Sequence, residues 1–324
     1  MSVASAVLLS IGFYEWGSGF VLFIGMIPLL LVEDDLYQHR KDNNPGSILV
    51  YASITFVLLT LLTVWWVKNS VFIALIASLF VNTAFQLVPF FLFHFIKRKA
   101  GPRLGYLSLI VLWVSFEYLF LNVQVNFPWC VFGNAFASDV KFIQWYDVTG
   151  TLGGSLWVLV MNVLLFKVFT GIRANRSFQA NRSIISWSLA FLIVPVIISL
   201  IKYYTYEEDE HPYEFVVLQP NIDPWAKFVE MPQDEQTAFL LDEARSMVSR
   251  STDYIVGPET FINNSVWHHN IYIHPEIEKL FDFVNEYPNV KFIVGAMTYK
   301  RYLPGDSVSS TAKRYGQSDI FYDS

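Results

Sequence analysis

The sequence contains little charge and almost no cysteine. Its single cysteine, Cys130, excludes an internal disulfide framework and every metal motif that is built from several thiolates. Charged side chains make up 15% of the chain, whereas soluble domains contain roughly 25%. No basic segment precedes the apolar N-terminus, so residues 2–13 lack the pattern of a cleaved signal peptide.

The few charges are unevenly distributed, and the composition changes near Tyr206. Residues 1–206 contain 13 basic and 8 acidic side chains, whereas residues 207–324 contain 9 basic and 20 acidic ones. The first part therefore has a membrane-like composition and the second that of a water-soluble α/β domain. The acidic excess of the second part argues against a nucleic-acid partner.

Apolar runs in the first part predict a bundle of about seven membrane spans. Four of the runs are at least 18 residues long, and two others are close to the minimum length for a span. The N-terminal run is shorter and could be a clipped helix or a re-entrant segment. The predicted spans are residues 2–13, 17–32, 48–67, 70–96, 104–121, 152–170 and 183–203.

Basic residues predict the orientation of these spans. The loops at 33–47, 97–103 and 167–182 contain ten Lys and Arg residues, and the intervening loops contain two. Because basic loops stay in the cytoplasm, residues 207–324 are expected on the opposite side of the membrane. In a bacterium this is the periplasmic face of the inner membrane. A cytoplasmic second part would require one span more or fewer.

The second part alternates between strand and helix patterns. Strands are expected at 214–219, 253–257, 290–298 and 320–322, and residues 303–319 are expected to form a polar loop. Between the first three strands lie two predicted helices, 232–250 and 275–287. This order predicts neighbouring parallel strands joined by right-handed crossovers.

Two of these strands end in turns that could carry chemistry. One turn is Gln219-Pro220-Asn221-Ile222, and the other is Pro258-Glu259. A carboxylate at the end of a buried strand suits a general base, because partial burial would raise its pKa towards neutrality. A lone Pro-Glu is usually an ordinary loop acid, but two such turns after a membrane part favour the catalytic interpretation.

An ordered set of segments resembles the apolipoprotein N-acyltransferase family of the carbon–nitrogen hydrolase (nitrilase) superfamily. These segments are residues 8–13, 24–31, 127–133 (Phe-Pro-Trp and a later Gly), 150–162, 217–222 and 258–259. The resemblance implies a polytopic α-helical membrane bundle followed by an α/β nitrilase-like αββα domain. It also implies that this domain is incomplete at the C-terminus.

The activity implied by the resemblance is acyl transfer from a phospholipid to the N-terminal diacylglyceryl-cysteine of a bacterial lipoprotein. A Cys thiolate forms a thioester, a Glu takes its proton, and a Lys holds the oxyanion. Only the Glu maps here, onto Glu259, because Lys300 and Lys313 fall too early. These 324 residues alone are therefore expected to be inactive. No cofactor is expected, and the protein is expected to be a monomer in the lipid bilayer.

Other residues have competing interpretations. Cys130 lies at a family position that varies and is expected to be an apolar filler, not the nucleophile. Glu117, inside an apolar span, is either functional or an acid that reaches the interface. Trp129, Glu117, Trp225 and Phe228 are predicted substrate contacts. The sequence departs from the family's common Lys-Trp at Lys227-Phe228, and no Arg follows Glu117-Tyr118. His268, His269 and His274 fit no standard metal spacing, so no metal site is predicted.

Two rival functions stay open. The protein could be another membrane-tethered carbon–nitrogen hydrolase, such as an amidase, although the Phe-Pro-Trp loop and the multi-span bundle argue against this. It could also be a catalytically incomplete or split member of the same family, because no family-like thiol accompanies Glu259 in these residues.

Overall fold

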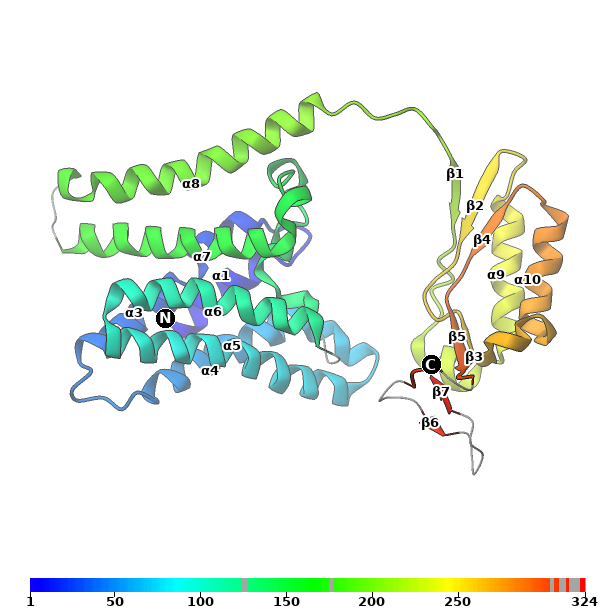
Figure 1. Cartoon of the computed structure of the whole chain (residues 1–324), viewed down its shortest axis with the longest axis horizontal. Helices are drawn as coiled ribbons and strands as arrows, with labels where there is room; N and C mark the ends of the chain where they lie inside the picture. Colours follow the sequence, from blue (N-terminus) through cyan, green and yellow to red (C-terminus); the bar gives the residue numbers. More distant parts are fainter. Residues whose placement is uncertain (124–126, 175–177, 304–305, 309–312, 315–320, 324) are drawn as a thin grey trace. The chain divides into compact units, whose positions relative to one another are not determined.

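The computed structural model describes residues 1–123, 127–174, 178–303, 306–308, 313–314 and 321–323. The chain forms two compact units, Met1–Glu207 and Glu208–Ser324 (Figure 1). The first is helical and the second is an α/β unit, as the fold class predicted from the sequence requires. That prediction is confirmed: long apolar helices precede a small parallel α/β region with partial sheets.

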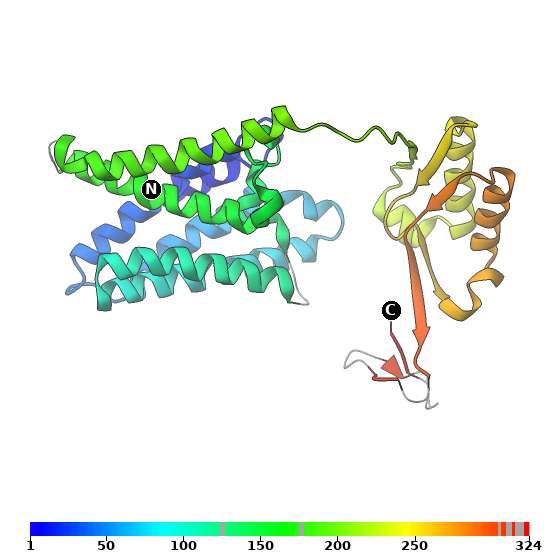
Figure 2. The same ribbon diagram turned by 45° about the horizontal axis from the view of Figure 1, so that its top comes forward.

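The first unit is a bundle of apolar helices. Five helices among the described residues, α4 to α8, are long and apolar enough to cross a membrane. The chain is therefore a multi-pass membrane protein. Neighbours in sequence lie side by side, as for α5 with α6 and α7 with α8 (Figures 1 and 2). The helices are α1 (Ser2–Ile11), α2 (Leu22–Gly25), α3 (Ile27–Gln38), α4 (Ser47–Val64), α5 (Phe72–Ala100), α6 (Pro102–Asn122), α7 (Tyr146–Arg173, kinked at Gly150) and α8 (Phe178–Thr205).

The segment predicted as a span at 17–32 is not one helix, which corrects that prediction. It forms a 3₁₀ turn (Gly19–Val21), the four-residue α2, and α3, with a break at Met26. A buried side chain of α7 satisfies the backbone at this break: the Met26 N–H donates to Asn162 Oδ1 (2.8 Å), and Asn162 Nδ2 donates to the Leu22 carbonyl (2.7 Å). The break is tolerated because the protein itself supplies these partners.

The N-terminal helix is too short to cross a bilayer alone. The ten residues of α1 span about 15 Å, which is half of the roughly 30 Å hydrocarbon thickness. The Ser5 hydroxyl of α1 accepts a hydrogen bond from the Leu29 N–H of α3 (2.9 Å). The total of seven crossings stays a prediction.

The second unit contains two small sheets and two covering helices. In the first sheet the order is β1-β2-β4 with parallel pairing, and in the second it is β3-β5-β7-β6. Both helices lie on the same side of the first sheet (Figures 1 and 2). The elements are β1 (Glu214–Val217), α9 (Gln233–Met247), β2 (Thr252–Val256), β3 (Ile262–Trp267), α10 (Pro275–Glu286), β4 (Lys291–Ile293), β5 (Ala296–Arg301), β6 (Lys313–Arg314) and β7 (Phe321–Asp323).

Burial alternates along the first sheet. Val216 and Ile255 belong to the core that contains α9 and α10, whereas Phe215 and Val217 are exposed. Since successive side chains of a strand point to opposite faces, one face of the sheet packs on the helices. The other face is open among the described residues.

Three strand predictions need correction. The predicted strand 290–298 is split at Gly295 into β4 and β5, which belong to different sheets. Strand β3 was not predicted, and β6 lies within the predicted loop 303–319. The predicted strand 320–322 corresponds to β7, although Ile320 itself lies outside the described residues. Strands β3 (Ile-Asn-Asn-Ser-Val-Trp) and β6 (Lys-Arg) contain too few apolar residues to be recognised as strands from the sequence.

Candidate functional site

Glu259 lies beyond the end of the central strand of the first sheet. Strand β2 is flanked by β1 and β4, and all three run parallel. The pairing continues past the strands, because the Leu218 N–H donates to the Val256 carbonyl and the Gly257 N–H to the Ile293 carbonyl, both at 2.8 Å. The carboxyl ends of the three strands therefore meet at one edge, where ligand sites of open α/β sheets commonly lie.

The turn that carries Glu259 is closely packed against Gly295. Thr260 has a left-handed backbone with φ of 50°, and the Ile262 N–H donates to the Gly295 carbonyl (3.0 Å). A Cβ atom on Gly295 would lie 2.5 Å from the Thr260 nitrogen and 3.0 Å from the Glu259 Cα. Only glycine fits there without moving the turn. The prediction from the sequence missed this residue, although a glycine between short apolar runs is the signal of such a close approach.

Lys227 is a second charged group at this edge. Its Nζ donates to the backbone carbonyl of Glu259 (3.2 Å). The π-helical turn that carries it, Ala226–Glu230, is held because the Lys227 carbonyl accepts from Gln236 Nε2 (2.7 Å) and Asn263 Nδ2 (2.8 Å). Burial lowers the pKa of Lys227, and the nearby charge of Glu259 opposes this shift. The sequence analysis had noted Lys227 only as part of a family motif.

Two predicted substrate contacts lie on the same turn or next to it. The Phe228 ring lies 5.2 Å from Lys227 Nζ, so the structure brings Phe228, Lys227 and Glu259 together. Trp225 precedes the turn, and its N–H donates to Asp223 Oδ1 (2.9 Å). Both aromatic side chains are exposed. Glu259 is also exposed among the described residues, so the partial burial expected for it is not found.

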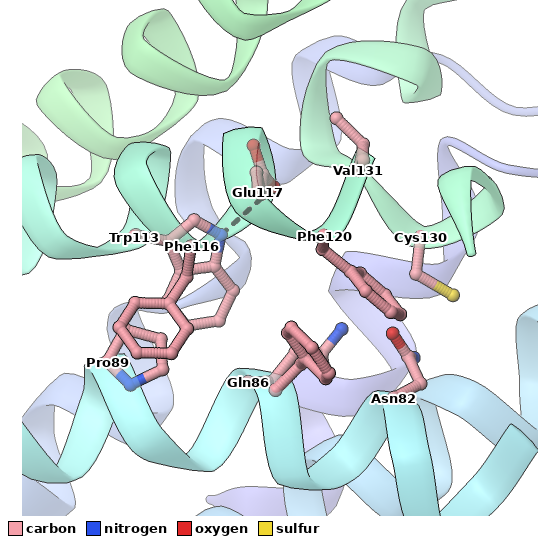
Figure 3. A pocket seen from close by; sticks show the side chains of 10 residues that line it. Asn82, Gln86, Pro89, Trp113, Phe116, Glu117, Phe120, Cys130 and Val131 are labelled. Carbon is pink, nitrogen blue, oxygen red and sulfur yellow. Dashed lines mark hydrogen bonds between the residues drawn. The ribbon is translucent and has the colours of Figure 1, made fainter. Parts of the chain in front are cut away.

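Glu117 and Trp129, the other two predicted contacts, belong to the first unit. Glu117 is buried, and its Oε1 accepts from Trp113 Nε1 and from the Phe132 N–H, both at 3.0 Å (Figure 3). It therefore ties α6 to the loop that follows the Phe-Pro-Trp motif. Trp129 on that loop is 49% exposed. Its ring packs edge-on against the ring of Trp66, with 5.6 Å between the ring centroids.

Cys130 lies in the same loop and is buried. Its Sγ is 3.3 Å from Thr63 Oγ1 of α4, and burial raises the pKa of the thiol to about 11. A thiol with this pKa is protonated at neutral pH, whereas the thiolate is the reactive nucleophile. The environment of Cys130 is that of a structural cysteine.

Metal ligands are not clustered in the described part of the chain. No group of three or more His, Cys, Asp or Glu side chains there could hold a metal ion. His268 and His269 lie exposed on the 3₁₀ turn His268–Ile273.

A bundle of apolar helices followed by an α/β unit whose central strand leads to an acid defines a multi-pass membrane protein with an appended α/β unit. The family model of the apolipoprotein N-acyltransferase N-terminal domain matches residues 5–164. The chain belongs to the apolipoprotein N-acyltransferase family, which confirms the resemblance noted in the sequence.

Individual relatives agree with this assignment. An apolipoprotein N-acyltransferase of Chlorobaculum tepidum is 27% identical over 268 residues, which cover 81% of this chain and 49% of the relative. An apolipoprotein N-acyltransferase of Geobacter metallireducens is 26% identical over 269 residues, which cover 80% of this chain and 50% of the relative. An apolipoprotein N-acyltransferase of Rickettsia prowazekii is 28% identical over 118 residues, which cover 36% of this chain and 23% of the relative. The chain spans about half the length of the first two relatives.

Proposed function

We propose that this protein transfers an acyl chain from a phospholipid to the N-terminal diacylglyceryl-cysteine of lipoproteins. The observation that carries the proposal is Glu259 beside Lys227, at the carboxyl edge of a parallel sheet, in a member of this family. Family membership favours acyl transfer over the amidase alternative.

In this proposal Glu259 is the general base. It takes the proton from a cysteine thiol, and the thiolate attacks the ester carbonyl of the phospholipid to form an acyl thioester. The amine of the lipoprotein's N-terminal cysteine then attacks the thioester and releases the thiol. Cys130 is not this nucleophile, because its buried thiol is protonated at neutral pH. The mechanism applies to a chain in which a second thiol and an oxyanion-binding Lys complete the site.

Gly295 and Lys227 would support this chemistry in different ways. Gly295 lets the Glu259 turn pack against the β4–β5 connection, which positions the backbone that carries the carboxylate. Lys227 places a cation at the Glu259 turn, since its Nζ donates to the Glu259 carbonyl.

We also propose that residues 208–324 lie outside the cytoplasm. Two basic loops of the first unit meet at one end, where Arg98 donates to the carbonyls of Arg40 and Asn43. Arg173 lines a pocket at this end together with Asp35 and Tyr51. If this basic end faces the cytoplasm, the five long helices from Ser47 onward cross an odd number of times and carry the second unit across.

A reporter that is active only outside the cytoplasm tests the orientation. Fused after Tyr206 it should be active, and fused after Arg182 it should be silent. The reverse pattern would refute the orientation and, with it, a role on the periplasmic face.

The catalytic proposal is tested in a hybrid in which this chain continues into the second half of the Chlorobaculum tepidum relative. The hybrid should form an acyl thioester and acylate a diacylated lipopeptide. Glu259→Gln should lower the rate on the order of 10²–10⁴-fold, the usual contribution of a general base. Glu235→Gln, an exposed acid in the first turn of α9, is the control and should leave the rate unchanged. The proposal is contradicted if the Glu259→Gln hybrid keeps its activity. It is also contradicted if the hybrid that carries no substitution forms no acyl thioester.

A further inference from the structure

Lys167 is a half-buried cation near the basic end of the first unit. It belongs to α7, and its Nζ lies 5.4 Å from the centre of the Tyr106 ring of α6. The two helices lie side by side (Figures 1 and 2). Tyr106 itself is buried. The ammonium group of Lys167 is therefore held at the contact between α6 and α7.

Arg103 is a second cation at this contact. It precedes Tyr106 by three residues in α6, so the two side chains are neighbours on one face of the helix. Its charge is close enough to that of Lys167 for the two to repel each other. Within the described part of the chain, neither cation forms an ion pair with an acid. A partly buried charge without a counter-ion is unfavourable.

The nearest carboxylates are already used by a third cation. Lys97 Nζ lies 4.8 Å from the centre of the same Tyr106 ring, and it pairs with Glu33 and Asp34. Together with the two cations above, this Tyr106 cluster contains three positive and two negative side chains. With His94 neutral, the cluster has a net charge of +1.

The acids of the neighbouring helices are not placed to balance this charge. Residues 148–206, which include most of α7 and all of α8, contain no Asp or Glu. The one acid of α6, Glu117, follows Arg103 by 14 positions, which is about 21 Å along a helix. On α3, the next acid after Asp34 is Asp35, and it faces His39 at 3.5 Å. An anion from outside the bundle would therefore neutralise the Tyr106 cluster.

The surroundings of the two cations favour a lipid over a soluble anion. Arg103 is the second residue of α6, and Lys167 lies six residues before the end of α7, or about 9 Å. Long basic side chains near the ends of membrane helices reach the headgroup level. Leu107 and Val111 follow Arg103 at intervals of four residues on the same helix face, and they are 56% and 53% exposed. This face of an apolar span thus has a cation at headgroup depth and apolar side chains below it.

We propose that Arg103 and Lys167 bind the phosphate group of a phospholipid with a net negative charge, and that the acyl chains of this lipid lie along Leu107 and Val111. One negative charge balances the Tyr106 cluster, whereas a zwitterionic lipid adds no net charge. Basic sites between membrane helices bind anionic headgroups in the same way. The proposal does not depend on the orientation proposed above, because both leaflets have a headgroup layer.

Native mass spectrometry of the purified chain measures this binding. The protein is released from micelles that contain equal amounts of phosphatidylglycerol, which is anionic, and phosphatidylcholine, which is zwitterionic. One phosphatidylglycerol should be retained in preference. Lys167→Gln and Arg103→Gln should each weaken its retention at least about fivefold, since a cation near the headgroups contributes about 1 kcal/mol. Equal retention of the two lipids, or unchanged retention in both variants, would overturn the proposal.

Two control variants separate a defined site from a general attraction to the basic end. Lys99→Gln removes an exposed cation from the last turn of α5 and should leave the retention unchanged. A loss as large as that in Lys167→Gln would mean that the charge acts diffusely and that no site exists. Lys167→Arg keeps the charge and should keep the lipid. If it loses the lipid as completely as Lys167→Gln, the charge-based assignment is wrong.

Thermal unfolding distinguishes a lost site from a misfolded variant. Phosphatidylglycerol should raise the unfolding midpoint of the unsubstituted chain and of Lys99→Gln, and it should leave that of Lys167→Gln unchanged. An equal rise in all three proteins would contradict the proposal. Glycerophosphoglycerol, the same headgroup without acyl chains, should not displace the lipid. If it does, the site binds a soluble phosphate and the lipid assignment is refuted.

Discussion

Lys97 is a charged side chain on which the packing of α3, α5 and α6 depends. Its Nζ lies 2.5 Å from Glu33 Oε2, 3.0 Å from Asp34 Oδ1 and 3.1 Å from the Tyr106 hydroxyl. The other oxygen of Glu33 lies 2.8 Å from His94 Nδ1. The side chains of Glu33, His94 and Lys97 are completely buried. The buried charges of Glu33 and Lys97 stabilise each other at this depth.

Lys97→Met tests this dependence. The substitution leaves Glu33 buried with His94 as its remaining partner, and breaking a buried ion pair from one side costs about 3–5 kcal/mol. At 1.4 kcal/mol for each factor of ten, this lowers the folding equilibrium roughly 100- to 4,000-fold. Adding Glu33→Leu removes the unpaired carboxylate, so the double variant should be more stable than Lys97→Met alone.

The measurement is unfolding in mixed micelles, followed by tryptophan fluorescence. Lys99→Met on the same helix is the control, because Lys99 is exposed and its loss should cost less than about 0.5 kcal/mol. The reasoning is refuted if Lys97→Met costs no more than Lys99→Met. It is also refuted if the two single changes add in the double variant, because coupled residues deviate from additivity.

Three further predictions concern Asn162, Cys130 and Glu214, whose carboxylate accepts hydrogen bonds from the hydroxyls of Ser249, Ser251 and Thr252. Asn162→Leu leaves the Met26 N–H and the Leu22 carbonyl unpaired, so the same unfolding assay should show a loss of about 1–3 kcal/mol; an unchanged stability would mean that other groups satisfy the break. Cys130 should react slowly with a maleimide at pH 7 and about tenfold faster for each pH unit up to its pKa of about 11, because the thiolate is the reactive form; fast labelling at pH 7 would contradict its burial. Hydrogen bonds from Ser251, Thr252 and Ser249 lower the pKa of Glu214 below its usual value of 4.5. The stabilisation by the ionised carboxylate is therefore complete above pH 4.5 and is lost as the pH falls through the lowered pKa. Glu214→Gln should flatten the acid unfolding profile of the second unit, and an unchanged profile would refute the linkage.

The sequence alone was sufficient for the long apolar helices and for the parallel β1-β2-β4 arrangement. Both depend on local information: a run of about 20 apolar residues forms a helix in lipid, and alternating strand and helix patterns lead to parallel pairing. The family was also recognisable, because its short motifs occur in order along the chain. The position of Glu259 after a strand followed from the same pattern.

Tertiary structure decided what depends on contacts between distant residues. The break at Met26 is stabilised by Asn162, 136 positions away, and the split of 290–298 follows from the packing of Gly295 against Thr260. Lys227 reaches Glu259 across 32 positions, and Lys97 reaches Glu33 across 64. Such pairs leave no periodic trace in the sequence, because one polar side chain suits many loops or helix faces. Its role depends on which backbone or charge the fold places within hydrogen-bond distance.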